Sequence, residues 1–313
     1  MIRYMATRFA LAIPTILAVL TLVFLVVRVI PGDPATAALG DYASQEAVEA
    51  LRARMGLNDP IYVQYFRFLG DLLRGDLGTS MITGTPIWLS IKAVLPYTLQ
   101  LTGSAVVIGA LLGIPIGVYT AVKRNSLADY VGRVISLAGL SVPAFYLGIL
   151  IMLVFAVELG WFPAVGGGEQ GDPQDLIEHL VLPAMTLGLI MTASVARLTR
   201  SAMLNVLSEH YVRTARSKGV KERVVIVGHG LRAALVPIVS ILGIWVANLI
   251  ADSVLTETIF ARPGLGKLLV GAINQRDYTQ LQSVMVVYAL FVVVVNLVTD
   301  IIYSVVDPRI TTE

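Results

Sequence analysis

Few residues in this 313-residue chain have the side chains and spacing that catalysis or metal binding needs. Cysteine is absent, which excludes disulfides and thiolate catalysis but does not fix the compartment. The three histidines are His179, His210 and His229. None stands in the HExxH pattern of a zinc protease. Gly264–Lys267 resembles part of a phosphate loop, but Ala261 and Leu268 replace the first glycine and the hydroxyl residue that a Walker A sequence requires. We therefore predict neither an enzyme nor a cofactor bound by this chain.

The densest pattern of functional side chains is a basic segment, residues 209–232. Ser208 is predicted to cap a short helix, and Gly219 suits the end of that helix, where a left-handed residue is needed. A second helix is expected to begin at residues 220–222. Its predicted apolar face holds Val224, Val227 and Leu231. In one interpretation the positive charges only hold the segment inside the cell and touch anionic lipid head groups. In the other, the short helix docks in a groove of a soluble partner, and the glycine between the two helices favours docking.

The elements that position this segment are predicted to be membrane helices. Hydrophobic residues make up 56% of the chain and charged residues only 14%, whereas soluble domains carry roughly 25% charged residues. Six apolar stretches approach bilayer-spanning length. They are Phe9–Ile30, Leu95–Val122, Val134–Leu159, Leu180–Leu198, Leu235–Leu255 and Leu281–Val305. The fold class is thus an all-α integral membrane protein with about six transmembrane helices. The net charge of +2 is too small to indicate a nucleic-acid partner.

Lysine and arginine set the predicted orientation, because cytoplasmic loops are enriched in them. With the N-terminus in the cytoplasm, the inside segments hold most of these residues, including Arg3, Arg8, Lys123, Arg124, Arg133, Arg197, Arg200 and Arg309 together with the basic segment. The short outside loops hold only Arg262, Lys267 and Arg276. Both termini are therefore predicted to be cytoplasmic. The expected organisation is residues 1–30 with the first span, an extracytoplasmic region 31–94, and a core 95–313 with a cytoplasmic loop 200–234.

The extracytoplasmic region is predicted to be helical. Residues 47–55 have helical spacing and good helix formers. Residues 62–73 form an amphipathic run rich in aromatic side chains. That run is suited to the membrane interface, but we favour packing against the outer ends of the spans.

Polar residues within the spans are candidates for function, because ionisable groups at membrane depth are rare. Asn248 and Asp252 lie one turn apart in the fifth span, and Gln100 lies near the outer end of the second. These three are candidate residues of a translocation path, and an interfacial carboxylate in water is an equally good account of Asp252. For Asp300 we expect an ion pair with Arg197 or Arg200. Gly109, Gly113 and Gly117 form a row that permits close packing of another helix.

The basic segment resembles the coupling loop of ABC-importer permeases, and most closely that of the dipeptide/oligopeptide branch. The matching runs are Tyr211–Gly219 and His229–Arg232. The general loop reads Glu-Ala-Ala, three residues, Gly, nine residues, then Ile-x-Leu-Pro, so that Ala215, Gly219 and Leu231 fall on family positions. The resemblance extends over nearly the whole chain through Pro31–Pro34, Gly56–Pro60, Tyr62–Tyr65, Arg74–Gly78, Glu257–Phe260, Pro263–Gly266 and Asp307–Arg309.

This resemblance implies a permease subunit of the bacterial cytoplasmic (inner) membrane that imports peptides or similar small solutes by alternating access. It implies a second homologous permease subunit, two ATP-binding subunits that hold ATP and Mg, an extracytoplasmic solute-binding protein, and membrane lipid as partners. The residues expected to couple the chain to the ATPase are Glu209, Tyr211, Arg213, Thr214, Ala215, Arg216, Lys218, Gly219, His229, Leu231 and Arg232. The alternatives are a stand-alone secondary transporter or channel, and a membrane-embedded enzyme.

Overall fold

The computed structural model describes residues 2–29, 32–40 and 42–306, and this part of the chain is helical with no β-strand. The first elements are α1 (Ile2–Val29), α2 (Pro34–Leu39), α3 (Gln45–Arg54), α4 (Ile61–Leu73), α5 (Ile87–Val122), α6 (Leu127–Ser141), α7 (Ala144–Met152) and η1 (Leu153–Glu158). They are followed by α8 (Pro173–Leu207), α9 (His210–Ser217), α10 (Glu222–Val224), η2 (Val225–Leu231), α11 (Arg232–Ile259), α12 (Leu265–Gln275) and α13 (Tyr278–Val306). The prediction of an all-α fold is confirmed.

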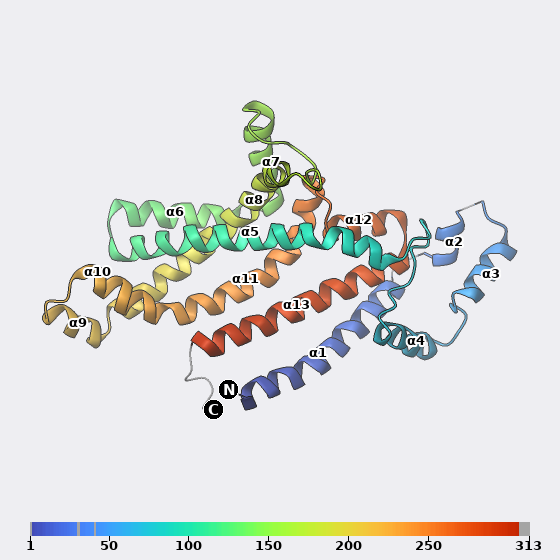
Figure 1. Ribbon diagram of the computed structural model, residues 1–313, viewed down its shortest axis with the longest axis horizontal. Coiled ribbons are helices and arrows are strands. Elements are labelled where there is room, and N and C mark those ends of the chain that lie inside the picture. Colours follow the sequence, from blue (N-terminus) through green and yellow to red (C-terminus); the bar gives the residue numbers. More distant parts are fainter. Residues whose placement is uncertain (1, 30–31, 41, 307–313) are drawn as a thin grey trace.

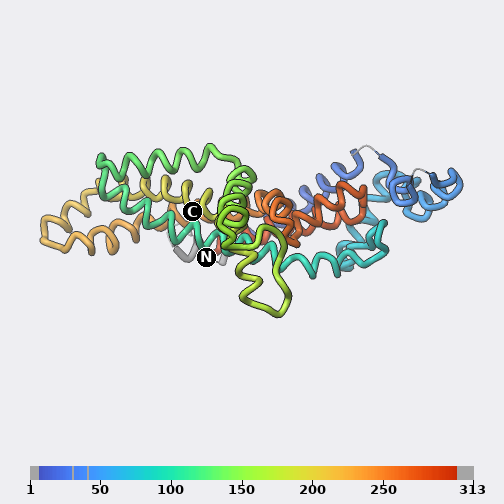
Figure 2. Tube along the Cα trace, turned by 90° about the horizontal axis from the view of Figure 1, so that it is seen from above, coloured from blue at the N-terminus to red at the C-terminus, as the bar shows by residue number. Residues whose placement is uncertain are grey.

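The molecule is elongated, and its two ends differ (Figures 1 and 2). Helix α9 and the adjoining α10 lie at one end, and α2 and α3 lie at the other. Helix α1 begins, and α13 ends, on the side of the bundle toward α9 (Figure 1). The basic segment and the predicted extracytoplasmic region are therefore far apart, as the predicted topology requires.

Five helical stretches are long and apolar enough to cross a membrane, among the described residues. They are Thr7–Val29, Ile87–Val122, Pro173–Leu207, Glu222–Ile259 and Tyr278–Ile301. Five of the six predicted spans fall within these stretches, with two exceptions. Ile30 lies outside the described residues, and residues 302–305 lie beyond the last stretch but still within α13. The helix that contains the predicted fourth span, α8, is much longer than Leu180–Leu198. It begins earlier because Asp172 caps it and Pro173 occupies its first turn, where a missing N–H costs nothing.

The predicted third span, Val134–Leu159, is wrong as a single helix. Its residues belong to α6 and to the α7–η1 helix, which are bent by 102° relative to each other. Pro143 has no N–H for the helix, and its ring pushes Val142 into an extended conformation with φ −88° and ψ 122°. The pair counts as a sixth span only if the two parts together cross the membrane.

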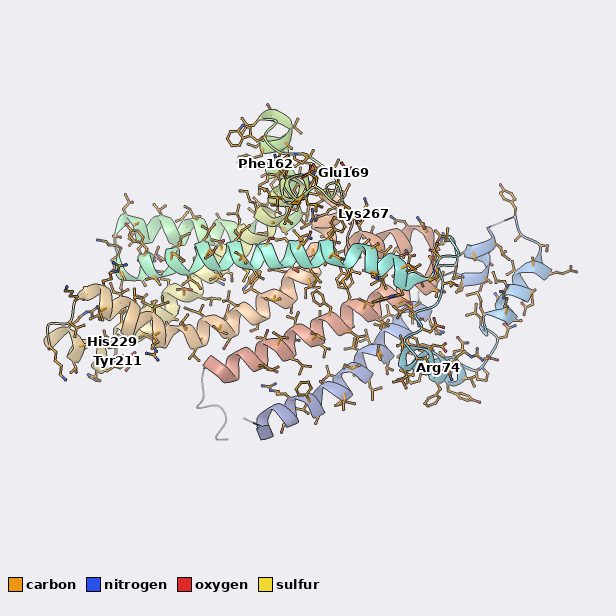
Figure 3. The ribbon with its side chains drawn as sticks, in the orientation of Figure 1. Arg74, Phe162, Glu169, Tyr211, His229 and Lys267 are labelled. Carbon is orange, nitrogen blue, oxygen red and sulfur yellow. The ribbon has the colours of Figure 1, made fainter. Side chains whose placement is uncertain are left out.

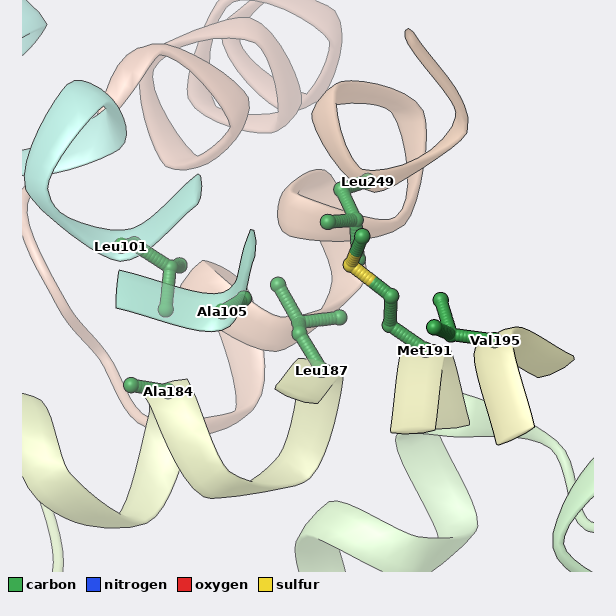
Figure 4. Close-up of a cluster of buried hydrophobic side chains, with 7 residues drawn as sticks. All are labelled: Leu101, Ala105, Ala184, Leu187, Met191, Val195 and Leu249. Carbon is green, nitrogen blue, oxygen red and sulfur yellow. The ribbon is translucent and has the colours of Figure 1, made fainter. Parts of the chain in front are cut away.

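The core lies where α5 packs along α8. Leu101, Ala105, Ala184, Leu187, Met191, Val195 and Leu249 form a buried apolar cluster from α5, α8 and α11 (Figure 4). The glycine row on α5 brings the two helices together, because a Cβ added at Gly113 would lie 2.7 Å from Val195 Cβ. Gly109 and Gly117 face Met191 and Thr199 in the same way. The predicted close packing of this row is confirmed.

The predicted helices of residues 47–55 and 62–73 are confirmed as α3 and α4. Helix α4 packs against α1, since the rings of Tyr65 and Phe68 lie 5.2 Å and 5.6 Å from that of Phe24. Its apolar face also joins Leu20 and Val286 in a buried cluster. Packing on the ends of the long helices, the interpretation we favoured, thus accounts for this face of α4.

The predicted ion pair of Asp300 with Arg197 or Arg200 is wrong. Asp300 lies 3.4 Å from Arg8 of α1, because α13 runs beside α1. Arg200 instead donates two hydrogen bonds, of 2.6 Å and 2.8 Å, to the fully buried Asp129 at the start of α6. Helix α6 packs against α8 and so places this carboxylate beside Arg200, which sequence spacing did not reveal.

Candidate functional site

The basic segment folds into a helical elbow, the name used here for residues 209–232. Helix α8 continues to Leu207, so Arg200 belongs to a long helix rather than to a loop. The predicted cap at Ser208 is wrong: Ser208 ends α8 and donates a hydrogen bond to Asn205 O, and Glu209 precedes α9 instead. Val212 is the buried residue that anchors α9.

Gly219 ends α9 as predicted, with φ +78°. Its N–H donates to Arg216 O at 2.9 Å, and the next N–H, of Val220, donates to Ala215 O at 3.2 Å. The side chains on either side of the turn are tied together, since Arg216 donates hydrogen bonds of 2.7 Å and 3.2 Å to Glu222. The hydrogen bonds to the Glu222 carboxylate raise the pKa of Arg216. The turn is therefore held by local contacts within the elbow.

The second helix begins at Glu222, but its predicted apolar face is wrong. Val224 and Val227 are exposed, whereas Val225 and Gly230 are buried. Residues 225–231 form a π-helix, whose i to i+5 spacing replaces the α-helical period used in the prediction. Gly230 allows close approach to α8, since a Cβ there would lie 3.2 Å from Leu207 and Met203. The helix then runs on without a loop into α11.

The residues predicted for coupling all lie on the elbow or on the first residue of α11. Most of their side chains are exposed, which fits a docking surface better than a packed core. The exposed members are Glu209, Tyr211, Arg213, Thr214, Arg216, Lys218, Gly219, His229 and Arg232. Ala215 and Leu231 are half-buried. Figure 3 places both Tyr211 and His229 at the α9 end of the molecule.

The three predicted path residues lie on α5 and α11. Asn248 is exposed and Asp252 is half-buried on α11. Gln100 of α5 accepts a 3.2 Å hydrogen bond from Arg262 instead. No hydrogen bond within the described residues joins Gln100 to Asn248 or Asp252, so their shared role in a path remains a prediction.

Sequence reasoning missed a buried polar cluster, called here the Glu257 cluster. Glu257, near the end of α11, has no exposed surface. Its carboxylate accepts hydrogen bonds from Thr98 Oγ1 at 2.6 Å, from Gly266 N at 2.7 Å and from Lys267 N at 3.3 Å. Thr98 Oγ1 in turn accepts a 2.9 Å bond from Leu265 N. The carboxylate thus holds the N-terminus of α12, which carries positive partial charge, and ties it to α5.

Arg262 belongs to the same cluster and is also fully buried. Besides Gln100, its guanidinium donates to His179 O of α8 at 3.3 Å, and it lies 5.2 Å from the centre of the Tyr97 ring. Burial lowers the pKa of Arg262. The cluster therefore joins α5, α8, α11 and α12.

The sequence did contain a signal for this cluster. The family resemblance includes the runs Glu257–Phe260 and Pro263–Gly266, but their sequence alone does not indicate what they do. The structure supplies the reason for Gly264, because a Cβ at this position would collide with the Glu257 carboxylate. A Cβ at Gly266 would likewise meet the Val254 backbone.

Comparisons with known proteins agree with this architecture along the whole chain. Residues 113–312 match the family described as "Binding-protein-dependent transport system inner membrane component". Residues 1–102 match the N-terminal component of the same kind of transport system. The elbow, α12 and the Glu257 cluster, apart from Tyr97, Thr98 and Gln100, fall in the first match.

Full-length relatives are similar over 99% of both chains. The dipeptide transport system permease protein DppB of Alkalihalophilus pseudofirmus is 40% identical over 331 residues. The glutathione transport system permease protein GsiC of Salmonella typhimurium is 40% identical over 310 residues, and the oligopeptide transport system permease protein AppB of Bacillus subtilis is 42% identical over 315. An inward-facing structure of the MetNI methionine ABC transporter matches with a TM-score of 0.58 and 20% identity, covering 71% of this chain and 98% of the other. That likeness concerns the fold.

Proposed function

This chain belongs to the family of binding-protein-dependent transport system inner membrane components, and we propose that it translocates short peptides as the permease of an ATP-driven importer. It is a multi-pass protein of the bacterial inner membrane and a transport subunit rather than an enzyme. The observation that carries the peptide proposal is similarity over the full length to permeases named for dipeptides, oligopeptides and glutathione.

We propose that the elbow receives the movement of the ATPase. Family membership implies ATP-hydrolysing and solute-binding partners. Nine of the eleven residues of the predicted coupling set are exposed in this single chain, and α9 is anchored by one buried side chain, Val212. A short helix that leaves its polar side chains free suits docking in a groove of a partner. The π-helical connection to α11 then passes a shift of α9 directly to a membrane helix.

The assembly we propose contains a second homologous permease subunit and two ATP-binding subunits that hold ATP and Mg. The predicted topology places the elbow and both termini in the cytoplasm and α2–α4 outside. An importer of this kind needs a contact surface on each side of the membrane, because the solute-binding protein delivers solute outside the cell and ATP is hydrolysed inside it. The separation of the elbow from α2 and α3 supports this arrangement (Figure 1).

The test is uptake of a labelled tripeptide into vesicles that hold the reconstituted complex. We expect uptake to require ATP on the side of the vesicle membrane that the elbow faces. It should also require the solute-binding protein on the opposite side. Uptake by the lone chain without ATP would support the secondary transporter or channel and would reject the proposal. Purification of the chain with its ATPases but without peptide uptake would reject only the peptide cargo.

A further inference from the structure

A polar cavity lies beside the membrane helices, between the ends of α1 and α13 and the helices α3 and α4. Its volume is about 660 Å³, within the roughly 300–1,000 Å³ range of small-molecule sites. Figure 3 places Arg74, which directly follows α4, at the opposite end from Tyr211 and His229. None of the path candidates Gln100, Asn248 and Asp252 lines this cavity.

Two of the three arginines that line this cavity are neutralised within the protein. Arg52 lies 3.2 Å from Asp33, and Arg67 lies 2.7 Å from Asp59. These pairs cancel two positive and two negative charges at the wall. The remaining charges decide which ligand the cavity favours.

Arg28 is the remaining cation, and its partners are neutral. Its Nε and Nη2 donate to Gln64 Oε1 at 3.1 Å and 2.9 Å, and its Nη1 donates to Gln282 Oε1 at 3.2 Å. The guanidinium also lies 3.7 Å from the centre of the Phe24 ring. No carboxylate of the described residues is within ion-pair distance of this half-buried side chain.

The guanidinium is held in place before any ligand arrives. Gln64 is fixed at its other end, since its Nε2 donates to Leu57 O at 3.1 Å and to Asp59 O at 2.8 Å. These contacts tie Gln64 of the Tyr62–Tyr65 motif to the backbone of the Gly56–Pro60 motif. An ordered guanidinium loses little further freedom when it binds a carboxylate.

The remaining acids of the cavity are Asp71 and Asp76. Asp76 is exposed, accepts a 2.8 Å bond from Gly78 N, and pairs with no cation of the described residues. The cation near Asp71 is Arg74, at 3.9 Å and with 81% of its side chain exposed, so water screens this pair. The cavity therefore keeps one cation, Arg28, and two carboxylates, Asp71 and Asp76, whose charges are not neutralised by a buried partner.

We propose that this cavity binds a free peptide as a zwitterion, with its carboxylate at Arg28 and its ammonium group at Asp71 and Asp76. The inference rests on the proposed function and adds a second place on the permease where peptide is held. Charge-assisted hydrogen bonds to both peptide ends would favour short, unblocked peptides over neutral or singly charged solutes.

The experiment measures peptide binding to the complete transporter complex in lipid nanodiscs, without the solute-binding protein. The probes are trialanine, its C-terminal amide and its N-acetyl derivative. The variants are Arg28→Gln and Asp76→Asn. Their controls are Arg54→Gln and Glu46→Gln, which make the same charge changes at exposed residues of α3 outside the cavity.

For the unaltered complex we expect each blocked peptide to bind about tenfold more weakly than trialanine, which is about 1.4 kcal/mol. Arg28→Gln should remove the preference for the free carboxylate only, and Asp76→Asn should reduce the preference for the free ammonium group only. The controls should keep both preferences. If Arg28→Gln does not fold, the exposed Asp76→Asn variant still tests the site with the acetylated peptide.

Equal binding of all three probes, or no binding, would overturn the inference. So would an Arg28→Gln complex that keeps both preferences but loses docking of the solute-binding protein, since the cavity would then be a protein contact. ATP-dependent uptake with the solute-binding protein is measured on the same preparation. Normal uptake without these binding preferences would reject the cavity site and leave the proposed function standing.

Discussion

In the Glu257 cluster, a carboxylate without exposed surface accepts a hydrogen bond from Thr98, 159 residues away in the chain. In the elbow, Arg216 and Glu222 are six residues apart, and their side chains are 41% and 55% exposed. The Glu257 carboxylate accepts its hydrogen bonds from other groups of this chain, whereas the hydrogen bonds of the elbow only hold the turn at Gly219. Side chains that a chain leaves unsatisfied at its surface are available to a partner, while those it buries must be satisfied internally. Changes in the cluster should therefore affect stability, and changes in the elbow should affect coupling.

The largest loss of stability is expected for Glu257→Ala. It leaves the buried Gly266 N–H and the Thr98 hydroxyl without their acceptor, and it removes the negative charge that acts on the buried Arg262. Removal of one partner from a buried charged network costs about 3–5 kcal/mol. Thermal unfolding in detergent should show a large fall in Tm or little folded protein. The control is Glu158→Ala, an exposed glutamate at the end of η1, which should unfold like the unaltered protein.

A smaller loss is expected for Gly264→Ala. The added methyl group would collide with the Glu257 carboxylate, and overpacking of a buried site costs about 1–3 kcal/mol. Gly271→Ala, where an added Cβ meets no atom within 4 Å in the same helix region, is the matched control. An unchanged Tm for Gly264→Ala would show that the cluster tolerates rearrangement and would weaken the contrast with the elbow.

Gly219→Val should separate stability from coupling. The position has φ +78°, which costs a side-chain residue about 1–2 kcal/mol, but the space around it is open. The complex should still assemble, and ATP hydrolysis should no longer drive peptide uptake. The ratio of peptide imported to ATP hydrolysed is the measurement. Uptake that remains stimulated by ligand in this variant would contradict a coupling role for the turn.

The smallest change in stability is expected for Arg216→Gln. Its bonds to Glu222 are exposed to water, where ion pairs contribute little. Tm should stay within experimental error, while the ratio of uptake to ATP hydrolysis should fall. Arg54→Gln, on α3 far from the elbow, should change neither quantity. A fall in Tm with normal coupling would assign Arg216 a structural role and would reverse the comparison.

The sequence by itself determined the long apolar helices, the turn at Gly219 and the close-packed glycine row. Each depends on local or periodic properties: apolar length for the bilayer, a left-handed residue for the turn, and small side chains at i and i+4 for packing. The short basic helix α9 was predictable for the same reason. Its contacts are mostly with its own neighbours in the chain.

Only the tertiary structure decided which polar groups meet. Asp300 pairs with Arg8 because α13 lies beside α1, and Arg200 reaches Asp129 because α6 packs against α8. Glu257 reaches Thr98 and the start of α12 through bonds that link distant parts of the chain. The π-helical stretch likewise changed which face of the elbow is buried. A hydrogen bond between distant residues depends on which helices pack together in space. Helical spacing can mark a packing face, as in the glycine row, but it does not identify the distant polar partner.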